Sequence, residues 1–182
     1  TGRTTPLAHH MVAPIKNLGD SVAPADVLYS LSKSFLSKWN DEPRRLGQPR
    51  DVTIVNRLGA GQEFPSATWL QIISTPRAAA ILGFFAEHFT SNAASSDVAV
   101  VFVIPQSLGD NVCDLLADLL AVLPASFAFE ITARTHVITP PSVSGASRVM
   151  FTYENTPFLA QSRRRQDDSR PVIIDLTNGA SS

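Results

Sequence analysis

The sequence predicts an α/β fold made of two repeats, each a small parallel sheet flanked by helices. Short β-branched runs alternate with segments in which apolar residues recur at helical spacing. The run Val98–Ile104 is apolar throughout, which is typical of a strand buried on both faces of a parallel sheet. The order strand, helix, strand, strand, helix also occurs twice along the chain, which favours a duplicated unit.

The first repeat is expected over residues 8–95. Apolar residues at helical spacing predict helices over residues 24–39 and 76–89. Each of these helices begins near a proline, which fits a first helical turn. The inner face of the second helix is expected to comprise Ala79, Leu82, Phe85 and Phe89. β-Branched and apolar runs predict strands at residues 11–15, 52–55 and 68–73.

The second repeat is expected over residues 96–182. A strongly apolar segment predicts a helix over residues 110–123, and Thr156-Pro157 predicts the start of a shorter helix. The expected strands of this repeat are residues 98–104, 127–131, 136–139, 149–153 and 172–176.

Two pairs of matching segments support the duplication. Lys16–Val22 matches Gln106–Val112 around a shared Leu-Gly-Asp, and both precede an expected helix. Trp69–Arg77 matches Met150–Phe158, and both place Thr-Pro where an expected strand turns into a helix. Each short match alone is common by chance, whereas the same order in the same context favours true duplication.

Composition excludes several classes of function. The chain has 182 residues, 44% of them hydrophobic, and a formal net charge of −1, so it lacks the overall charge that attracts nucleic acid or anionic membranes. Cys113 is the single cysteine, which excludes an intramolecular disulfide and metal sites built on cysteine pairs. No apolar run approaches the roughly 20 residues that span a membrane. We expect a soluble, intracellular fragment of a larger protein.

The sequence contains no recognisable catalytic or metal-binding motif. Gly59 and Gly61 begin a dinucleotide-like pattern, but Phe64 occupies the third glycine position, so we expect a turn. The histidines are too scattered to form a metal set, and His136 is expected to be a half-buried structural residue. Cys113 lies within an apolar helix and is expected to be core. These observations predict a protein without enzymatic activity, cofactor, metal or small-molecule substrate.

One basic run remains to be interpreted. Arg163-Arg164-Arg165 is followed at once by Asp167 and Asp168, which partly neutralise it. The favoured interpretation is a solvated helix end, because cations are stabilised near a helix C-terminus. A small nucleic-acid-binding patch is the alternative.

The β-α-β-β-α-β order of the two repeats resembles the BRCT family, whose tandem pairs bind phosphorylated peptides. In that family the first repeat holds the phosphate with a short polar residue after the first strand and a Thr-x-Lys pattern at the second helix. Thr75-Pro76-Arg77 falls at the second of these places. Lys16 and Asn17 follow the first expected strand, so the resemblance implies phosphate binding there as well.

The chain also departs from the family pattern. The Ser-Gly pair after the first strand is absent, Arg77 replaces the lysine, and the tryptophan of the third helix has no counterpart. Phe158 stands at the position equivalent to Arg77, so the second repeat cannot duplicate the phosphate site. We expect it to bind peptide residues beside the phosphate instead.

The residue types at this place suit an anion. A helix N-terminus carries unpaired N–H groups and a partial positive charge. The Thr75 hydroxyl can donate one hydrogen bond, and the Arg77 guanidinium can donate two parallel ones to a phosphate. The plainer interpretation is that Thr-Pro simply starts a helix and that Arg77 is solvated.

The resemblance implies a phosphorylated protein partner and a nuclear, chromosome-associated location, as in the C-terminal BRCT regions of kinetoplastid kinetochore proteins. A second interpretation stays open, because Ser74–Arg77, a helix and Val100–Pro105 resemble the Asn-Pro-Pro-Phe arrangement of cap-adenosine N6-methyltransferases. Ser74 stands in place of the essential asparagine, so that domain would be inactive. A structural module that joins subunits is the third interpretation.

Overall fold

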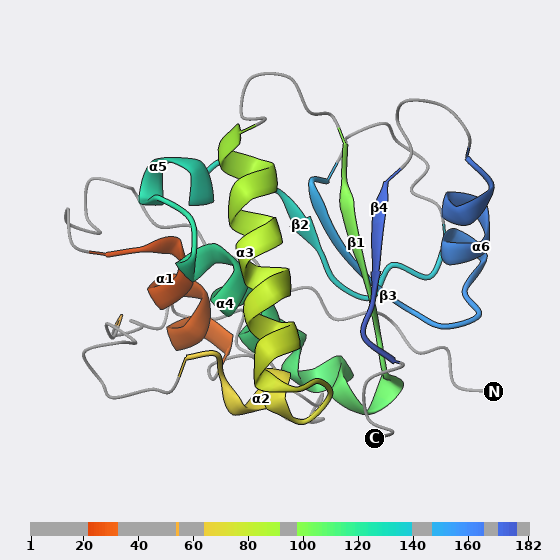
Figure 1. The fold of residues 1–182 in the computed structure, drawn as a ribbon, viewed down its shortest axis with the longest axis horizontal. Helices are drawn as coiled ribbons and strands as arrows, with labels where there is room; N and C mark the ends of the chain where they lie inside the picture. The colour runs from red at the N-terminus through yellow and green to blue at the C-terminus, as the bar shows by residue number, and fades with distance from the viewer. Residues whose placement is uncertain are drawn as a thin grey trace, which may run out of the picture.

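The computed structural model describes residues 22–32, 54, 64–91, 98–139, 147–165 and 171–177. These residues form a mixed α/β fold in which helices flank a parallel sheet on both sides (Figure 1). The α/β class predicted from the sequence is therefore confirmed.

In the described part of the chain the sheet has four strands, all parallel, in the order β2-β3-β1-β4. Phe102 of β1 lies level with Phe151 of β3 on one side and with Ile174 of β4 on the other. The strands are β1 (Val100–Ile104), β2 (Ala133–Arg134), β3 (Val149–Tyr153) and β4 (Val172–Asp175).

The central position of β1 follows from its composition. All five of its residues are buried, as expected for an apolar strand with helices over both faces. Val100, Phe102 and Ile104 point to one face, and Val101 points to the other. The predicted strand over residues 98–104 is confirmed with a slightly later start.

Most helices lie on one face of the sheet. In Figure 1 they stand to its left, whereas α6 stands to its right. Residues from both predicted repeats share one apolar cluster here, with Trp69 and Phe85 packed near Phe102. The elements of this layer are α1 (Pro24–Ser32), α2 (Ala67–Leu70), α3 (Thr75–Ser91), the 3-10 helix η2 (Gln106–Asn111), α4 (Val112–Ala121) and α5 (Ala125–Ala128).

The opposite face carries a smaller apolar cluster under α6 (Pro157–Arg164). Phe158 of that helix packs with Val101, Val137 and the partly buried Ile173. Thr156 caps α6, because its side-chain oxygen accepts a hydrogen bond from the Leu159 N–H at 3.2 Å. The predicted helix start at Thr156-Pro157 is confirmed.

Helix α3 spans Thr75–Ser91, so the helix predicted over residues 76–89 is confirmed with a start one residue earlier and an end two residues later. Its buried residues are Ala78, Leu82, Phe85 and Phe89. Ala79 is exposed, so the predicted inner face was wrong at that position. The observed set follows the i, i+4, i+7 spacing of a single helical stripe more closely than a set that starts at Ala79.

The strand predicted at residues 68–73 is wrong, because this segment forms α2 and a turn. Trp69, Ile72 and Ile73 are buried, whereas Leu70 is exposed. Burial at i, i+3 and i+4 is the period of a helical turn, and a strand would bury alternate residues. Burial of the tryptophan against the core decides the conformation of this short segment.

Two strands predicted near the middle of the chain are also wrong. Residues 127–131 hold the end of α5 and a turn, in which the Pro124 carbonyl accepts hydrogen bonds from Phe127 and Ala128 at 3.0 Å each. Residues 136–139 do not form the predicted strand. The short strand β2 ends before them, at Arg134, and His136 has φ = 56°, which lies outside the extended region.

The predicted repeat agrees with the described structure only in part. Apart from η2 and the single-turn α5, the described elements between residues 98 and 177 follow the order β, α, β, β, α, β. The match between Trp69–Arg77 and Met150–Phe158 does not extend to secondary structure, because the first segment starts as a helix and the second as strand β3. The predicted strand 11–15 and the matched Lys16–Val22, apart from Val22, lie outside the described residues, as does the predicted strand 52–55 apart from Ile54.

Among the described residues, no helix is long and apolar enough to cross a membrane.

Candidate functional site

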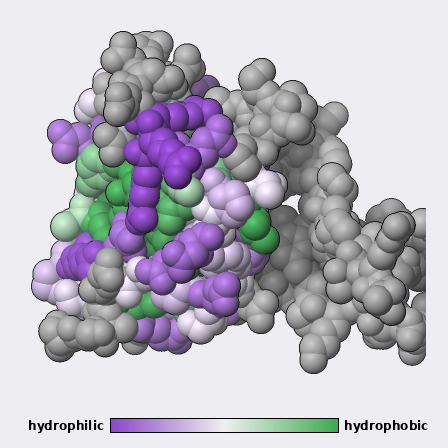
Figure 2. Space-filling model, turned by 90° about the vertical axis from the view of Figure 1, so that its right-hand side faces the viewer, coloured by the Kyte–Doolittle hydropathy of each residue, from purple (hydrophilic) through white to green (hydrophobic). Residues whose placement is uncertain are grey.

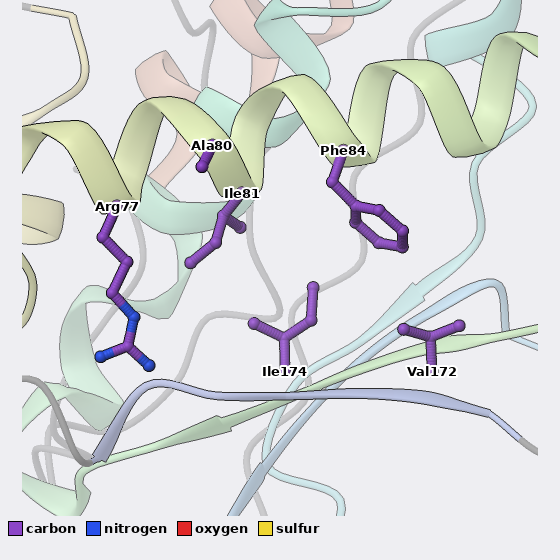
Figure 3. Close-up of a pocket in the computed structure, with 6 residues that line it drawn as sticks. All are labelled: Arg77, Ala80, Ile81, Phe84, Val172 and Ile174. Atoms are coloured by element: carbon purple, nitrogen blue, oxygen red, sulfur yellow. The ribbon is translucent and has the colours of Figure 1, made fainter.

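A groove of about 270 Å³ runs between α3 and the edge strand β4. In Figure 3 the labelled side chains of α3 point toward β4, and those of β4 point toward α3. The groove is lined by Arg77, Ala80, Ile81, Phe84, Val172 and Ile174. Its wall is almost entirely apolar, with one guanidinium at one end.

Regular backbone spacing places these side chains on facing surfaces. Arg77, Ile81 and Phe84 recur at i, i+4 and i+7, so they form one stripe along α3. Val172 and Ile174 are two residues apart on β4 and therefore point to the same side of the sheet. The Phe84 side chain is 38% exposed, which leaves an aromatic ring open to a ligand.

The Arg77 side chain connects α3 to the end of β4. Its Nη2 group donates a hydrogen bond to the backbone carbonyl of Asp175 at 2.8 Å. Val172 directs its N–H toward β1, where it donates to the Ala99 carbonyl at 2.9 Å. Because backbone groups alternate in direction along a strand, the Asp175 carbonyl points away from β1. Arg77 therefore occupies part of the open edge of the sheet.

The helix start beside Arg77 is exposed and carries no acidic residue. Ser74, Thr75 and Pro76 are exposed, and α3 has no acidic residue in its first turn. Unpaired N–H groups at such a start attract negative charge. Thr75 lies at this start but does not line the groove, so Arg77 alone links the groove to it.

The structure describes two of the four residues predicted to bind phosphate. Thr75 and Arg77 lie together in the first turn of α3. Lys16 and Asn17 lie outside the described residues. Sequence reasoning missed the apolar lining, because Val172 and Ile174 join the site from nearly the other end of the sequence.

The carboxylate of Asp175, whose backbone carbonyl binds Arg77, faces the other side of the sheet. The Asp175 carboxylate lies 3.5 Å from the Arg163 guanidinium of α6. It also accepts hydrogen bonds from the backbone N–H and the hydroxyl of Thr177 at 3.0 and 2.6 Å. Asp175 therefore does not neutralise Arg77 with its carboxylate. Arg163 and Arg164 are exposed in the last turn of α6, as predicted.

A second polar cluster lies near the carboxyl ends of β1 and β3. The His136 Nδ1 and the Tyr153 hydroxyl form a short hydrogen bond. A Cβ atom at Gly109 would lie 2.7 Å from that hydroxyl, so any larger residue at this position would require the tyrosine side chain to shift. His136 is exposed, so the prediction that it is half-buried was wrong; its backbone has φ = 56° and does not continue the strand that was expected there.

Cys113 packs against the main apolar cluster at the start of α4 and is half-buried. Burial, with a smaller effect of the Asp114 carboxylate, raises the pKa of its thiol. A raised pKa keeps the thiol protonated and weakens it as a nucleophile, in line with the predicted core role. The described residues contain no group of three or more His, Cys, Asp or Glu side chains that could hold a metal ion.

The surface around α6 is mostly polar. On the side of the molecule shown in Figure 2, hydrophilic residues in purple surround a smaller apolar area in green.

The described residues define a parallel α/β fold in which β4 pairs on one side only and lies beside an apolar groove. Comparison of the chain with protein-family models, curated proteins and solved structures found no match. The function proposed below therefore rests on the residues of the site itself.

Proposed function

We propose that this chain is a non-enzymatic protein-interaction module that binds a phosphorylated peptide segment in the groove between α3 and β4. The observation that carries the proposal is the pairing of an apolar wall with one guanidinium at its end. A peptide with apolar side chains beside a phosphate can place those side chains against the apolar wall and its phosphate near the guanidinium.

The charge of the site supports an anionic ligand. A guanidinium has five N–H donors, and the Asp175 carbonyl accepts a hydrogen bond from Arg77 Nη2. Further donors can reach a phosphate at the exposed helix start beside Thr75. Since the first turn of α3 has no acidic residue, no carboxylate there repels the ligand.

The test is binding of an immobilised phosphoserine and phosphothreonine peptide library, followed by calorimetry with the selected peptide and its dephosphorylated form. Arg77→Ala is expected to weaken the phosphopeptide by about 10-fold to 100-fold, as loss of a charged hydrogen bond predicts. Arg134→Ala is the matched control, because Arg134 is exposed on β2 at the far edge of the sheet. Equal binding of the two peptide forms would overturn the proposal.

The same proposal includes the finer organisation suggested by the family resemblance. In it, residues 8–95 and 96–182 are two BRCT-like repeats, and the protein docks a phosphorylated partner in the nucleus, at chromosomes or kinetochores. The β-α-β-β-α-β order of residues 98–177 supports this view for the second repeat. Imaging of the tagged full-length protein would test the location, since a wholly cytoplasmic signal contradicts it.

A second candidate function is a degenerate, inactive methyltransferase-like domain. The observation that favours it is the order of elements after Ser74: α3 starts at the carboxyl end of β4, where Arg77 meets Asp175, and leads into β1 and then Pro105. Calorimetry with S-adenosylmethionine distinguishes the two candidates. Measurable binding would favour the methyltransferase-like domain over the phosphopeptide module.

A further inference from the structure

The outer edge of β4 is open along the groove. Within the described part of the chain, β4 pairs only with β1. Since Val172 uses its backbone groups toward β1, the N–H and C=O of Ile173 and Asp175 point outward. One of these outward groups, the Asp175 carbonyl, is bound by the Arg77 side chain. An outward row of backbone donors and acceptors is a template for another strand.

From this edge and the groove beside it, we propose that the partner segment binds as an added strand along β4, with alternate side chains in the groove. The inference rests on the proposed function and specifies how the same site holds its ligand. Strand addition uses backbone hydrogen bonds for affinity and alternate side-chain pockets for specificity.

The spacing of the groove defines the expected ligand. Val172 and Ile174 lie about 7 Å apart, because a parallel strand rises roughly 3.3 Å per residue. Two apolar side chains of the added strand, also two residues apart, would face Val172, Ile174 and Phe84. The next side chain on that face would approach Arg77, at the carboxyl end of β4. The motif is therefore two alternate apolar residues with an anionic residue at the same spacing, which follows them in a parallel added strand and precedes them in an antiparallel one.

The position of Arg77 favours a foreign peptide over a second copy of this chain. In a dimer joined through two β4 edges, the copy would offer Val172 and Ile174 to the groove. Its Asp175 would not meet Arg77, because that carboxylate faces α6 and Arg163. A second copy thus fills the apolar part of the groove and leaves the guanidinium without an anion.

The first experiment measures binding of peptides of the form Val-Thr-Val-Thr-phosphoserine, in this order and reversed, by fluorescence anisotropy. In the order that binds, each backbone nitrogen is methylated in turn. We expect the loss of affinity to alternate along the peptide. Methylation of an N–H that faces β4 should lower the affinity about 10-fold or more, and methylation of the N–H groups that face away should change it little. A phosphate-dependent peptide without this alternation would overturn strand addition and leave the proposed function standing.

The second experiment blocks the groove from the protein side. Ala80 and Ala79 are adjacent exposed residues of α3, and only Ala80 lines the groove. Ala80→Phe should lower peptide affinity about 10-fold or more, whereas Ala79→Phe should leave it unchanged. Equal effects of the two variants, with unchanged circular dichroism, would overturn the groove as the binding surface.

Two other outcomes also decide whether the groove binds a peptide strand. If neither the phosphorylated nor the unphosphorylated peptides bind in either order, both the strand addition and the proposed function fail. If light scattering shows a dimer that Ala80→Phe dissociates, the occupant of the groove is a second copy, and the peptide proposal is overturned.

Discussion

Two helices of this protein start with the same Thr-Pro dipeptide, yet the two starts differ in almost every contact. At α6, Thr156 is buried, caps the helix, and shares a hydrogen bond of 2.9 Å with Thr152. At α3, Thr75 is exposed. The residue after each proline shows the same contrast. Phe158 is buried after Pro157, whereas Arg77 follows Pro76 and reaches the outer edge of β4.

The comparison shows two uses of the Thr-Pro dipeptide. At α6 it stabilises the fold, whereas at α3 it leaves polar groups exposed to a ligand. Polar groups that already satisfy one another inside the protein stabilise the fold and have little left for a ligand. Exposed groups at a helix start contribute less to folding and remain available. We therefore expect substitutions at α6 to change stability and substitutions at α3 to change binding.

The largest effect on stability is expected at Phe158. Phe158→Ala removes a buried ring from the cluster with Val101 and Val137, and it should lower the free energy of unfolding by about 3–5 kcal/mol. Urea denaturation followed by circular dichroism measures this change. Phe129→Ala is the control, because Phe129 is 42% exposed and its loss should cost less than about 1 kcal/mol. A similar loss in both variants would contradict the structural role of the α6 start.

A smaller loss is expected at Thr156. Thr156→Val keeps the shape of the side chain but removes the oxygen that caps α6 and bonds to Thr152. The free energy of unfolding should fall by about 1–2 kcal/mol, as for loss of a helix cap. Denaturation of the double variant with Thr152→Val tests the coupling, since the two losses should not add.

Arg77 should contribute still less to stability. Arg77→Met keeps most of the apolar stem and removes the hydrogen bond to the Asp175 carbonyl. We expect the free energy of unfolding to fall by about 0.5–1.5 kcal/mol. A loss above that of Thr156→Val in the same urea series would show that Arg77 holds the fold together, and the contrast between the two helix starts would then fail.

The smallest effect is expected at Thr75. Its side chain is exposed, so Thr75→Ala should change the free energy of unfolding by less than about 0.5 kcal/mol. Phosphopeptide affinity should fall severalfold if the hydroxyl donates to the phosphate. Unchanged affinity would narrow the anion contact to Arg77 and the α3 backbone.

The sequence predicts the long elements of this fold better than the short ones. The β1 run is apolar throughout, as expected for a strand buried on both faces, and the α3 stripe spans enough turns for its helical period to appear, apart from Ala79. In α2 and α5 only a single turn forms, and the burial of Trp69 or the bend after Pro124 decides the conformation. Such tertiary effects override local propensity.

The candidate site could also be predicted only where local sequence determines it. Residue type and the Thr-Pro dipeptide identify Arg77 as a cation at a helix start. Its contact with Asp175 joins residues 98 positions apart, and no local pattern predicts it. The open edge of β4 is likewise a property of strand order, which a single sequence does not reveal.

The strand order also has a consequence for synthesis on the ribosome. Both neighbours of β1 lie later in the chain, so residues 100–104 leave the exit tunnel before β3 or β4 exists to pair with them. The nascent chain therefore carries an unpaired Val-Val-Phe-Val-Ile segment until β3 and β4 have been synthesised. Transiently exposed apolar segments of this kind are prone to self-association, so we expect β1 to be most vulnerable to aggregation during this interval.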